Sequence, residues 1–105
     1  MTTDNNKTET QVTGRWIKAD GTEETVTPRN GIKFKLDELQ EMVGGWIEYV
    51  SLPSIRKNLI INEEGKLISL PMNRTASILW EAEYGPTDII VGDALLVDFD
   101  EEDEE

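Results

Sequence analysis

The sequence predicts a single small α+β domain, in which a mixed or mainly antiparallel sheet carries one or two short helices. Three observations lead to this fold class. A helical pattern stops at paired glycines and turns directly into a strand, a two-residue hairpin signal stands near the amino terminus, and short strand-like runs alternate with turn residues. We expect residues 36–50 to be the segment around which the domain is organised. The predicted order is two strands, a helix, three strands, a second helix and a last strand.

The first helix is predicted over residues 36–43, where apolar side chains recur at spacings of three and four. Gly44 suits the left-handed conformation that ends many helices, because it has no Cβ to clash there, and Gly45 lets the chain reverse. The buried face is expected to hold Leu36, Leu39, Met42 and Val43, with Asp37, Glu38 and Glu41 turned to water.

A hairpin is predicted in residues 14–28, because Asp20-Gly21 suits the tight turns whose central residues need positive φ. Its strands are expected at about residues 15–19 and 22–27, with Trp16 and Val26 on the buried face.

Three further strands are predicted in the middle of the chain. Residues 46–52 are rich in aromatic and β-branched side chains and end at Pro53, which predicts a central strand. Residues 58–62 and 66–70 are predicted to form a second hairpin around a turn at residues 63–65.

The second helix is expected to begin after Asn73, which is a good N-cap residue. Ala76, Leu79 and Ala82 could form an inward stripe, with Ile78 and Glu81 away from it, whereas alternation in the same segment also fits an extended chain. Whether residues 74–84 are helical throughout therefore stays open. Residues 88–99 are predicted to form the last strand, with Gly92 marking a bulge or a close backbone approach.

Composition restricts the chemistry that this chain can perform. The protein has no Cys and no His, which removes disulfides, thiolate chemistry and the side chain that most often moves protons near neutral pH. No nucleophile and base pair and no metal-ligand set is visible in the sequence. We therefore expect neither enzyme activity nor a cofactor.

The formal charge of −12 comes from 22 acidic and 10 basic residues, and the last eight residues hold seven of the acids. Residues 1–13 are almost wholly polar and are expected to be disordered, residues 14–97 to form the domain, and residues 98–105 to be an acidic tail. There is no secretory signal and no run of about 20 apolar residues, so a cytoplasmic location without membrane association is expected.

Four motifs between residues 43 and 92 together resemble a known family. They are VGGWIE at residues 43–48, NEEGK at 62–66, LPMN at 70–73 and DIIVG at 88–92. In these segments the chain is similar to the small phage and mobile-element family catalogued as domain of unknown function 3846, over roughly residues 31–97. The resemblance implies an origin in a virus, plasmid or conjugative element, and it implies no activity. The hairpin at residues 14–28 and the acidic tail lie outside it.

The acidic tail is the first candidate binding element. A chain this negative should repel nucleic-acid backbones, so direct nucleic-acid binding is not expected. The tail is either a solvated segment that aids solubility or an arm that mimics phosphates and seeks a basic surface on a host protein. Its residues are Asp98, Asp100, Glu101, Glu102, Asp103, Glu104 and Glu105.

The alternative candidate is a site for a small anion or nucleotide. Basic side chains and an amide near a helix start could bind an anionic ligand, with backbone groups near the paired glycines. The candidate residues are Arg56, Lys57, Asn73, Arg74, Gly44 and Gly45.

The remaining features have plain structural interpretations. Asn62, Glu63 and Glu64 are expected to form a turn rather than a metal site, and Glu48 to face solvent. The three tryptophans, Trp16, Trp46 and Trp80, are expected to belong to the core.

Overall fold

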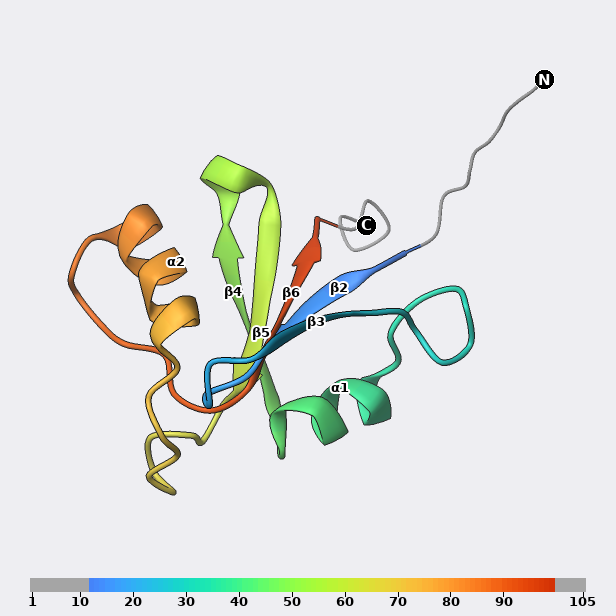
Figure 1. Cartoon of the computed structure of the whole chain (residues 1–105), viewed down its shortest axis with the longest axis horizontal. Helices are drawn as coiled ribbons and strands as arrows, with labels where there is room; N and C mark the ends of the chain where they lie inside the picture. Colours follow the sequence, from blue (N-terminus) through green and yellow to red (C-terminus); the bar gives the residue numbers. More distant parts are fainter. Residues whose placement is uncertain (1–11, 100–105) are drawn as a thin grey trace.

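The computed structural model describes residues 12–99, and it confirms an α+β fold (Figure 1). Five strands form one sheet, and two α-helices and one short 3₁₀ helix complete the domain. The elements are β2 (Gly14–Ile17), β3 (Glu23–Val26), α1 (Leu36–Val43), β4 (Ile47–Leu52), η2 (Pro53–Ile55), β5 (Lys57–Asn62), α2 (Arg74–Tyr84) and β6 (Ala94–Asp98).

The sheet is antiparallel throughout, with the strand order β3-β2-β6-β5-β4. The last strand, β6, lies in the middle and joins the β2–β3 hairpin to the β4–β5 hairpin. The predicted central strand, β4, is instead an edge strand. Its aromatic and β-branched residues suit any half-buried strand, so the composition alone does not distinguish an edge from a centre. In β4 only Val50 and Leu52 are buried.

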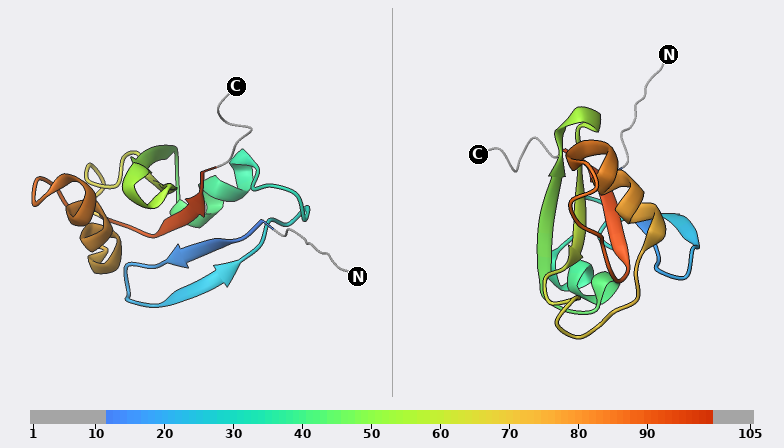
Figure 2. Two further views of the ribbon diagram at one scale, coloured as in Figure 1. Left: turned by 90° about the horizontal axis from the view of Figure 1, so that it is seen from above. Right: turned by 90° about the vertical axis from the view of Figure 1, so that its left-hand side faces the viewer.

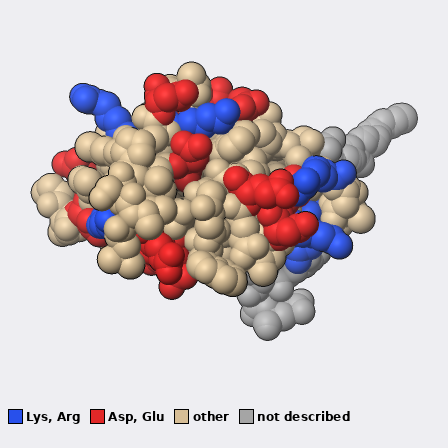
Figure 3. Space-filling model, turned by 90° about the horizontal axis from the view of Figure 1, so that it is seen from below, with Lys and Arg blue, Asp and Glu red and all other residues tan. Residues whose placement is uncertain are grey.

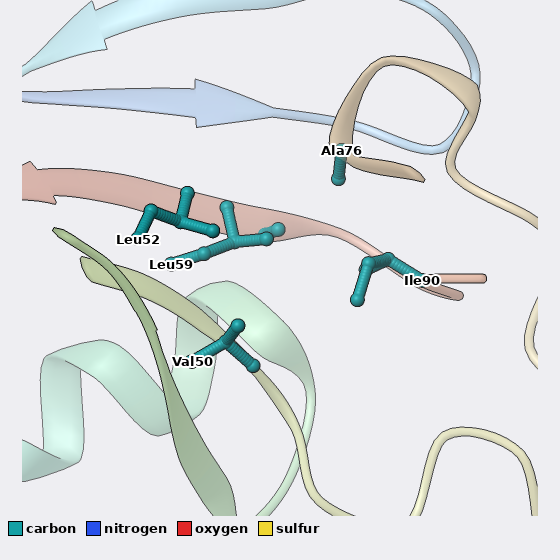
Figure 4. Close-up of a cluster of buried hydrophobic side chains, with 6 residues drawn as sticks. Val50, Leu52, Leu59, Ala76 and Ile90 are labelled. Atoms are coloured by element: carbon teal, nitrogen blue, oxygen red, sulfur yellow. The ribbon is translucent and has the colours of Figure 1, made fainter. Parts of the chain in front are cut away.

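The two α-helices cover opposite faces of the sheet (Figures 1 and 2). Side chains alternate between the faces along a strand, and in β5 Leu59 and Ile61 pack in one cluster while Ile60 packs in the other. The first cluster includes Ala76 of α2. Figure 4 shows its side chains, which come from this helix, from the strands and from Ile90. The second includes Leu39 of α1. The sheet therefore has an apolar layer on each side.

Helix α1 ends where the sequence predicts, at Gly44 with φ of 84°. Its buried face differs from the prediction at two positions, Leu36 and Glu38. Leu36 is 56% exposed, while Glu38 is buried and accepts a hydrogen bond of 3.1 Å from the backbone of Arg29. The Arg29 side chain also lies 3.7 Å from the Glu38 carboxylate. This pairing with the preceding loop, which spacing along the helix cannot reveal, allows a carboxylate to replace an apolar residue at the interface.

The predicted strand at residues 66–70 is wrong. Residues 63–69 form turns, with backbone hydrogen bonds such as Leu70 N to Gly65 O at 2.9 Å. The physical reason is that β5 already has β4 on one side and β6 on the other, so it offers no free edge. Leu67 is left 83% exposed at the surface.

The last strand is shorter than the predicted residues 88–99 and starts only at Ala94. Before it, Val91 makes a single bridge to Met72. Gly92 has φ of 81°, and a Cβ there would lie 2.7 Å from the Leu70 side chain. Gly92 therefore lies where two loops come close together, and it precedes the strand instead of standing inside it.

Helix α2 is continuous over all eleven residues, so residues 74–84 are not extended. The Asn73 side chain caps it by accepting a hydrogen bond from the backbone of Ala76, as predicted. Ala76 and Leu79 face the sheet, but Ala82 is exposed and does not extend the inward stripe.

Disorder is expected for residues 1–13, and residues 1–11 of this segment lie outside the described part of the chain. Residues 100–105 of the acidic tail also lie outside it. Among residues 12–99, no helix has the length and apolar character needed to cross a membrane.

Candidate functional site

A groove of about 600 Å³ lies between α2 and the loop that follows it. It opens to solvent, and apolar atoms make up most of its lining surface. This volume falls within the range of about 300 to 1,000 Å³ that is typical of ligand sites. The lining residues are Met72, Arg74, Ser77, Ile78, Glu81, Pro86, Thr87, Asp88 and Ile89.

Hydrogen bonds hold the two walls of the groove together. The Ser77 hydroxyl accepts a bond of 2.8 Å from the backbone N–H of Ile90 and donates one of 3.2 Å to its carbonyl. Trp80 Nε1 donates to Thr87 Oγ1 at 3.0 Å, and the N–H of Asn73 donates to the Ile90 carbonyl at 2.8 Å. Because several of these groups are buried, breaking a bond would leave an unpaired polar atom. The groove is therefore formed before anything binds.

The apolar side chains of the groove remain exposed although its walls are fixed. Met72, Ile78 and Ile89 are 49%, 57% and 43% exposed. On α2, Ile78 belongs to a stripe at positions 74, 77, 78 and 81, which share one face of a helix. Ser77 fixes the far wall, and Ile78 presents apolar surface. The groove thus combines a rigid frame with apolar area that a partner could cover.

Charged groups stand at the rim of the groove. Asp88 forms an ion pair with Lys66 and accepts a hydrogen bond of 2.8 Å from the backbone of Ile89. The Lys66 ammonium is the main cause that lowers the pKa of the Asp88 carboxyl below its ordinary value, and the Ile89 bond adds to it. Among residues 12–99, neither Arg74 nor Glu81 has an ion-pair partner. These two side chains are available to an incoming ligand.

Asn73, a candidate anion ligand, is completely buried and fully used by the fold. Its Oδ1 accepts the capping bond from Ala76 N at 3.1 Å. Its Nδ2 donates to the carbonyls of Ile17 and Gly92 at 2.9 and 2.8 Å. Asn73 therefore joins the start of α2 to β2 and to the approach of β6, and it positions the groove without lining it.

The other predicted site residues lie in separate places. Arg56 and Lys57 stand at the start of β5, where the Arg56 guanidinium lies 5.7 Å from the Phe99 ring centre and Lys57 forms an ion pair with Asp98. Gly44 and Gly45 lie beside Asn62, at the opposite end of β5. Only Arg74 of the predicted anion set lines the groove.

Asp98 is the one predicted tail residue that the structure describes, and its carboxylate is paired with Lys57. The other six, from Asp100 to Glu105, lie outside the described residues. In Figure 1, α2 lies at the left, whereas the end of β6 lies near the centre.

Basic residues of the described part are largely neutralised within the chain. At least five of the nine Lys and Arg residues in positions 12–99 form ion pairs with carboxylates. Carboxylates such as Glu48, Glu63 and Glu81 have no such partner among the described residues. On the face in Figure 3, acidic and basic side chains are mixed and wide uncharged areas separate them.

Residues 62–65 form a turn, as predicted, but it is not the turn of a hairpin, because residues 66–70 are not a strand. Asn62 is buried, donates to the carbonyl of Val43 at 3.2 Å and accepts from the backbone of Glu64 at 2.7 Å. Within the described part of the chain, no three acidic side chains come together as a metal-binding group.

The tryptophans differ from the prediction at one position. Trp16 packs against the apolar cluster that includes Leu39 of α1, and it donates to the Met42 carbonyl at 3.2 Å. Trp80 packs against the cluster that includes Ala76 of α2. Trp46 is exposed, because it precedes the edge strand β4. Glu48 faces solvent, as predicted.

Sequence reasoning did not identify the groove. It placed Ile78 and Glu81 away from the sheet and named Arg74 as a candidate ligand, which describes one wall. The opposite wall, residues 86–89, is held against α2 by hydrogen bonds that the sequence pattern does not reveal, among them those of Ser77 and Trp80.

Comparison with protein families gives one match. The model of a family described as a domain of unknown function (DUF3846) matches residues 16–105. This confirms the resemblance seen in residues 31–97, and it corrects its extent, because the hairpin and the acidic tail fall within the match. Neither a curated protein nor a solved structure matches the chain.

Proposed function

The chain belongs to the family described as a domain of unknown function (DUF3846), and from its geometry we propose that it is a non-enzymatic module that binds a partner protein. The observation that carries this proposal is the preformed groove beside α2, in which exposed apolar side chains stand on walls fixed by hydrogen bonds. Apolar surface held rigidly at the molecular exterior is a common mark of a protein-binding site.

The magnitude of the apolar contribution supports a reversible contact. Full burial of a side chain such as Ile or Met is worth about 1.5 to 3 kcal/mol, and roughly half of each is still exposed here. Covering Met72, Ile78 and Ile89 would then contribute about 1 kcal/mol each. Such a gain is offset in part by the entropy lost on association, so additional polar contacts at the rim are required.

Charge supports the choice of partner. The chain carries a net charge of −12, and most of its described Lys and Arg residues are paired internally. A partner with a basic surface would therefore be attracted, and association would be fastest at low salt. In this proposal the acidic segment from Asp98 to Glu105 steers the encounter, and the groove supplies the specific contact.

A second candidate function is the binding of a small anion. It is favoured by Arg74, whose guanidinium is unpaired among the described residues and lies at the start of α2. Against it, the same groove carries the carboxylates of Glu81 and Asp88, which repel an anion. Arg56 and Lys57 do not line this groove. We therefore place protein binding first.

The biological setting is part of the same proposal. We propose an origin in a phage or mobile element, as the resemblance of the motifs in residues 43–92 implies. The partner is then a host protein, and the outcome is interference in host defence or nucleic-acid binding. Determining the genes that flank this one in its source genome tests the setting. A neighbourhood of ordinary metabolic genes would contradict it.

The binding proposal is tested by affinity capture from a host lysate with matched variants. Ile78→Asp places a charge in the groove, and Leu36→Asp makes the same change at a site of similar exposure, 57% against 56%, on the other face of the sheet. We expect specific partners to be lost with Ile78→Asp and retained with Leu36→Asp. Removal of residues 98–105 should slow association and reduce its salt dependence. Equal capture by all three variants would refute the proposal.

Small-anion binding gives a different result in the same set of proteins. A ligand such as inorganic phosphate or a nucleotide would raise the melting temperature of the wild type and of the tail deletion, and Arg74→Ala would abolish the rise.

A further inference from the structure

We propose that the groove binds a short amphipathic helix of the partner, with an acidic and a basic side chain seven residues apart on either side of apolar residues. This inference rests on the proposed protein-binding function and adds the chemistry of the segment that is bound. It follows from the positions of the two unpaired charges and from the fixed apolar lining between them.

The two charges lie along one row of α2. Arg74 and Glu81 are separated by seven residues, which in a helix corresponds to two turns and about 10.5 Å along the axis. Ile78 lies between them on the same face. A ligand that neutralises both charges must therefore offer a carboxylate and a cation about 10 Å apart, with apolar surface between.

A helix meets this spacing, and an extended segment does not. Residues seven apart in a partner helix return to the same face at about 10.5 Å, which matches Arg74 and Glu81. In an extended strand, a separation of about 10 Å corresponds to three residues, whose side chains point to opposite faces. The nearest strand positions on one face are about 6.6 or 13 Å apart. Of the two conformations, only a helix places both charged side chains and the apolar side chains of the ligand on the face that meets the groove.

The apolar lining suits a helical ligand as well. Ile78 stands on the α2 wall, Ile89 on the loop wall and Met72 beside the start of α2. Side chains spaced by three or four residues on the ligand would lie between the two walls, in the manner of ridges that pack into grooves between helices. Because Ser77 and Trp80 already hold the walls together, little of the site has to become ordered on binding.

The orientation of the ligand follows from charge. Its acidic residue is placed next to Arg74 at the amino end of α2, where the helix dipole also favours a negative group. Its basic residue is placed next to Glu81. Asp88 remains paired with Lys66 and forms the edge of the loop wall.

The test uses a display library of random 16-residue peptides selected on the full chain, with depletion on Ile78→Asp. We expect the enriched peptides to carry an acidic and a basic residue seven positions apart, in that order or reversed, with two or more apolar residues at helical spacing between them. Measured by fluorescence anisotropy, they should bind Ile78→Asp at least tenfold more weakly and Leu36→Asp as tightly as the wild type.

Charge exchange tests the pairing directly. Arg74→Glu should weaken a selected peptide about three- to tenfold, and replacing the peptide's acidic residue by Lys should restore much of the loss. The control is the same peptide change measured on the wild type, which should weaken binding. Circular dichroism and melting curves of each variant verify folding, since Ile78 and Arg74 are both exposed.

The outcomes separate this inference from the broader proposal. Peptides that require the groove but lack the spaced charges, or that bind in extended form, overturn the helix inference and leave protein binding in place. Failure to enrich any peptide that discriminates Ile78→Asp overturns the inference, and together with unchanged partner capture by Ile78→Asp it overturns both.

Discussion

Replacement of Asn73 by Ala should destabilise this fold more than any other single Asn substitution in the described residues. The side chain is completely buried and makes three hydrogen bonds, to Ala76, Ile17 and Gly92. It ties α2 to β2 and to the segment that leads into β6.

The size of the effect can be worked from these contacts. Loss of an N-cap costs about 0.5 to 2 kcal/mol. The carbonyls of Ile17 and Gly92 each lose a buried donor, at about 1 to 3 kcal/mol per unsatisfied group. The sum is roughly 3 to 5 kcal/mol after partial relaxation, against a total stability of about 5 to 13 kcal/mol for a domain of this size. Asn73→Ala should therefore be at or near the limit of folding.

Urea unfolding followed by tryptophan fluorescence measures this loss. Asn30→Ala is the matched control, because Asn30 is exposed and its Oδ1 accepts from Ile32 and Lys33 backbone groups. We expect the control to lose less than about 1 kcal/mol, and Asn73→Asp to remain unstable because it keeps the cap acceptor but loses both donors. A loss below about 1 kcal/mol for Asn73→Ala would refute the role assigned to this residue.

Two further predictions concern the loops beside the groove. Gly92→Ala should lower stability by about 2 to 4 kcal/mol in urea unfolding, because its φ of 81° is left-handed and the new Cβ would lie 2.7 Å from Leu70. Gly21→Ala, with φ of 97° and no atom within 4 Å of its Cβ, should cost only about 1 to 2 kcal/mol, and equal losses would contradict the close-approach argument. Lys66→Ala should raise the pKa of Asp88 towards 3.8, as followed by carboxyl NMR titration, because the ion pair is the main cause of its lowering. Since the folded pKa of Asp88 is depressed, its contribution to stability is present above the unfolded value of about 3.9 and is lost as pH falls through the lower folded value. The variant should therefore be less stable than the wild type near neutral pH, and this difference should disappear in the acid range. An unchanged Asp88 titration would show that Lys66 does not control it.

Local features of this fold could be predicted from the sequence because their causes are local. Gly44 ends α1 through a conformation that its own lack of a Cβ permits. Asn73 caps α2 because its side-chain oxygen accepts a hydrogen bond from the backbone N–H three residues later. The strand β5 and the hairpin β2–β3 likewise follow from short runs and turn residues.

The features that could not be predicted depend on contacts between distant segments. β6 lies between β2 and β5, which moves β4 to an edge and removes any partner for residues 66–70. Glu38 is buried only because Arg29 approaches it from another segment. The groove arises in the same way, since its second wall is brought to α2 by Ser77 and Trp80. The only part of the groove that the sequence indicates locally is the outward face of α2, with Arg74, Ile78 and Glu81.

The most direct test of the binding account is amide NMR shift mapping of the full chain on addition of a captured partner or a selected peptide. The account predicts that the largest shifts fall in residues 72–81 and 87–89, around the groove. Largest shifts around Arg56, Lys57 and Asp98, where β5 begins and β6 ends, with an unperturbed groove would contradict it.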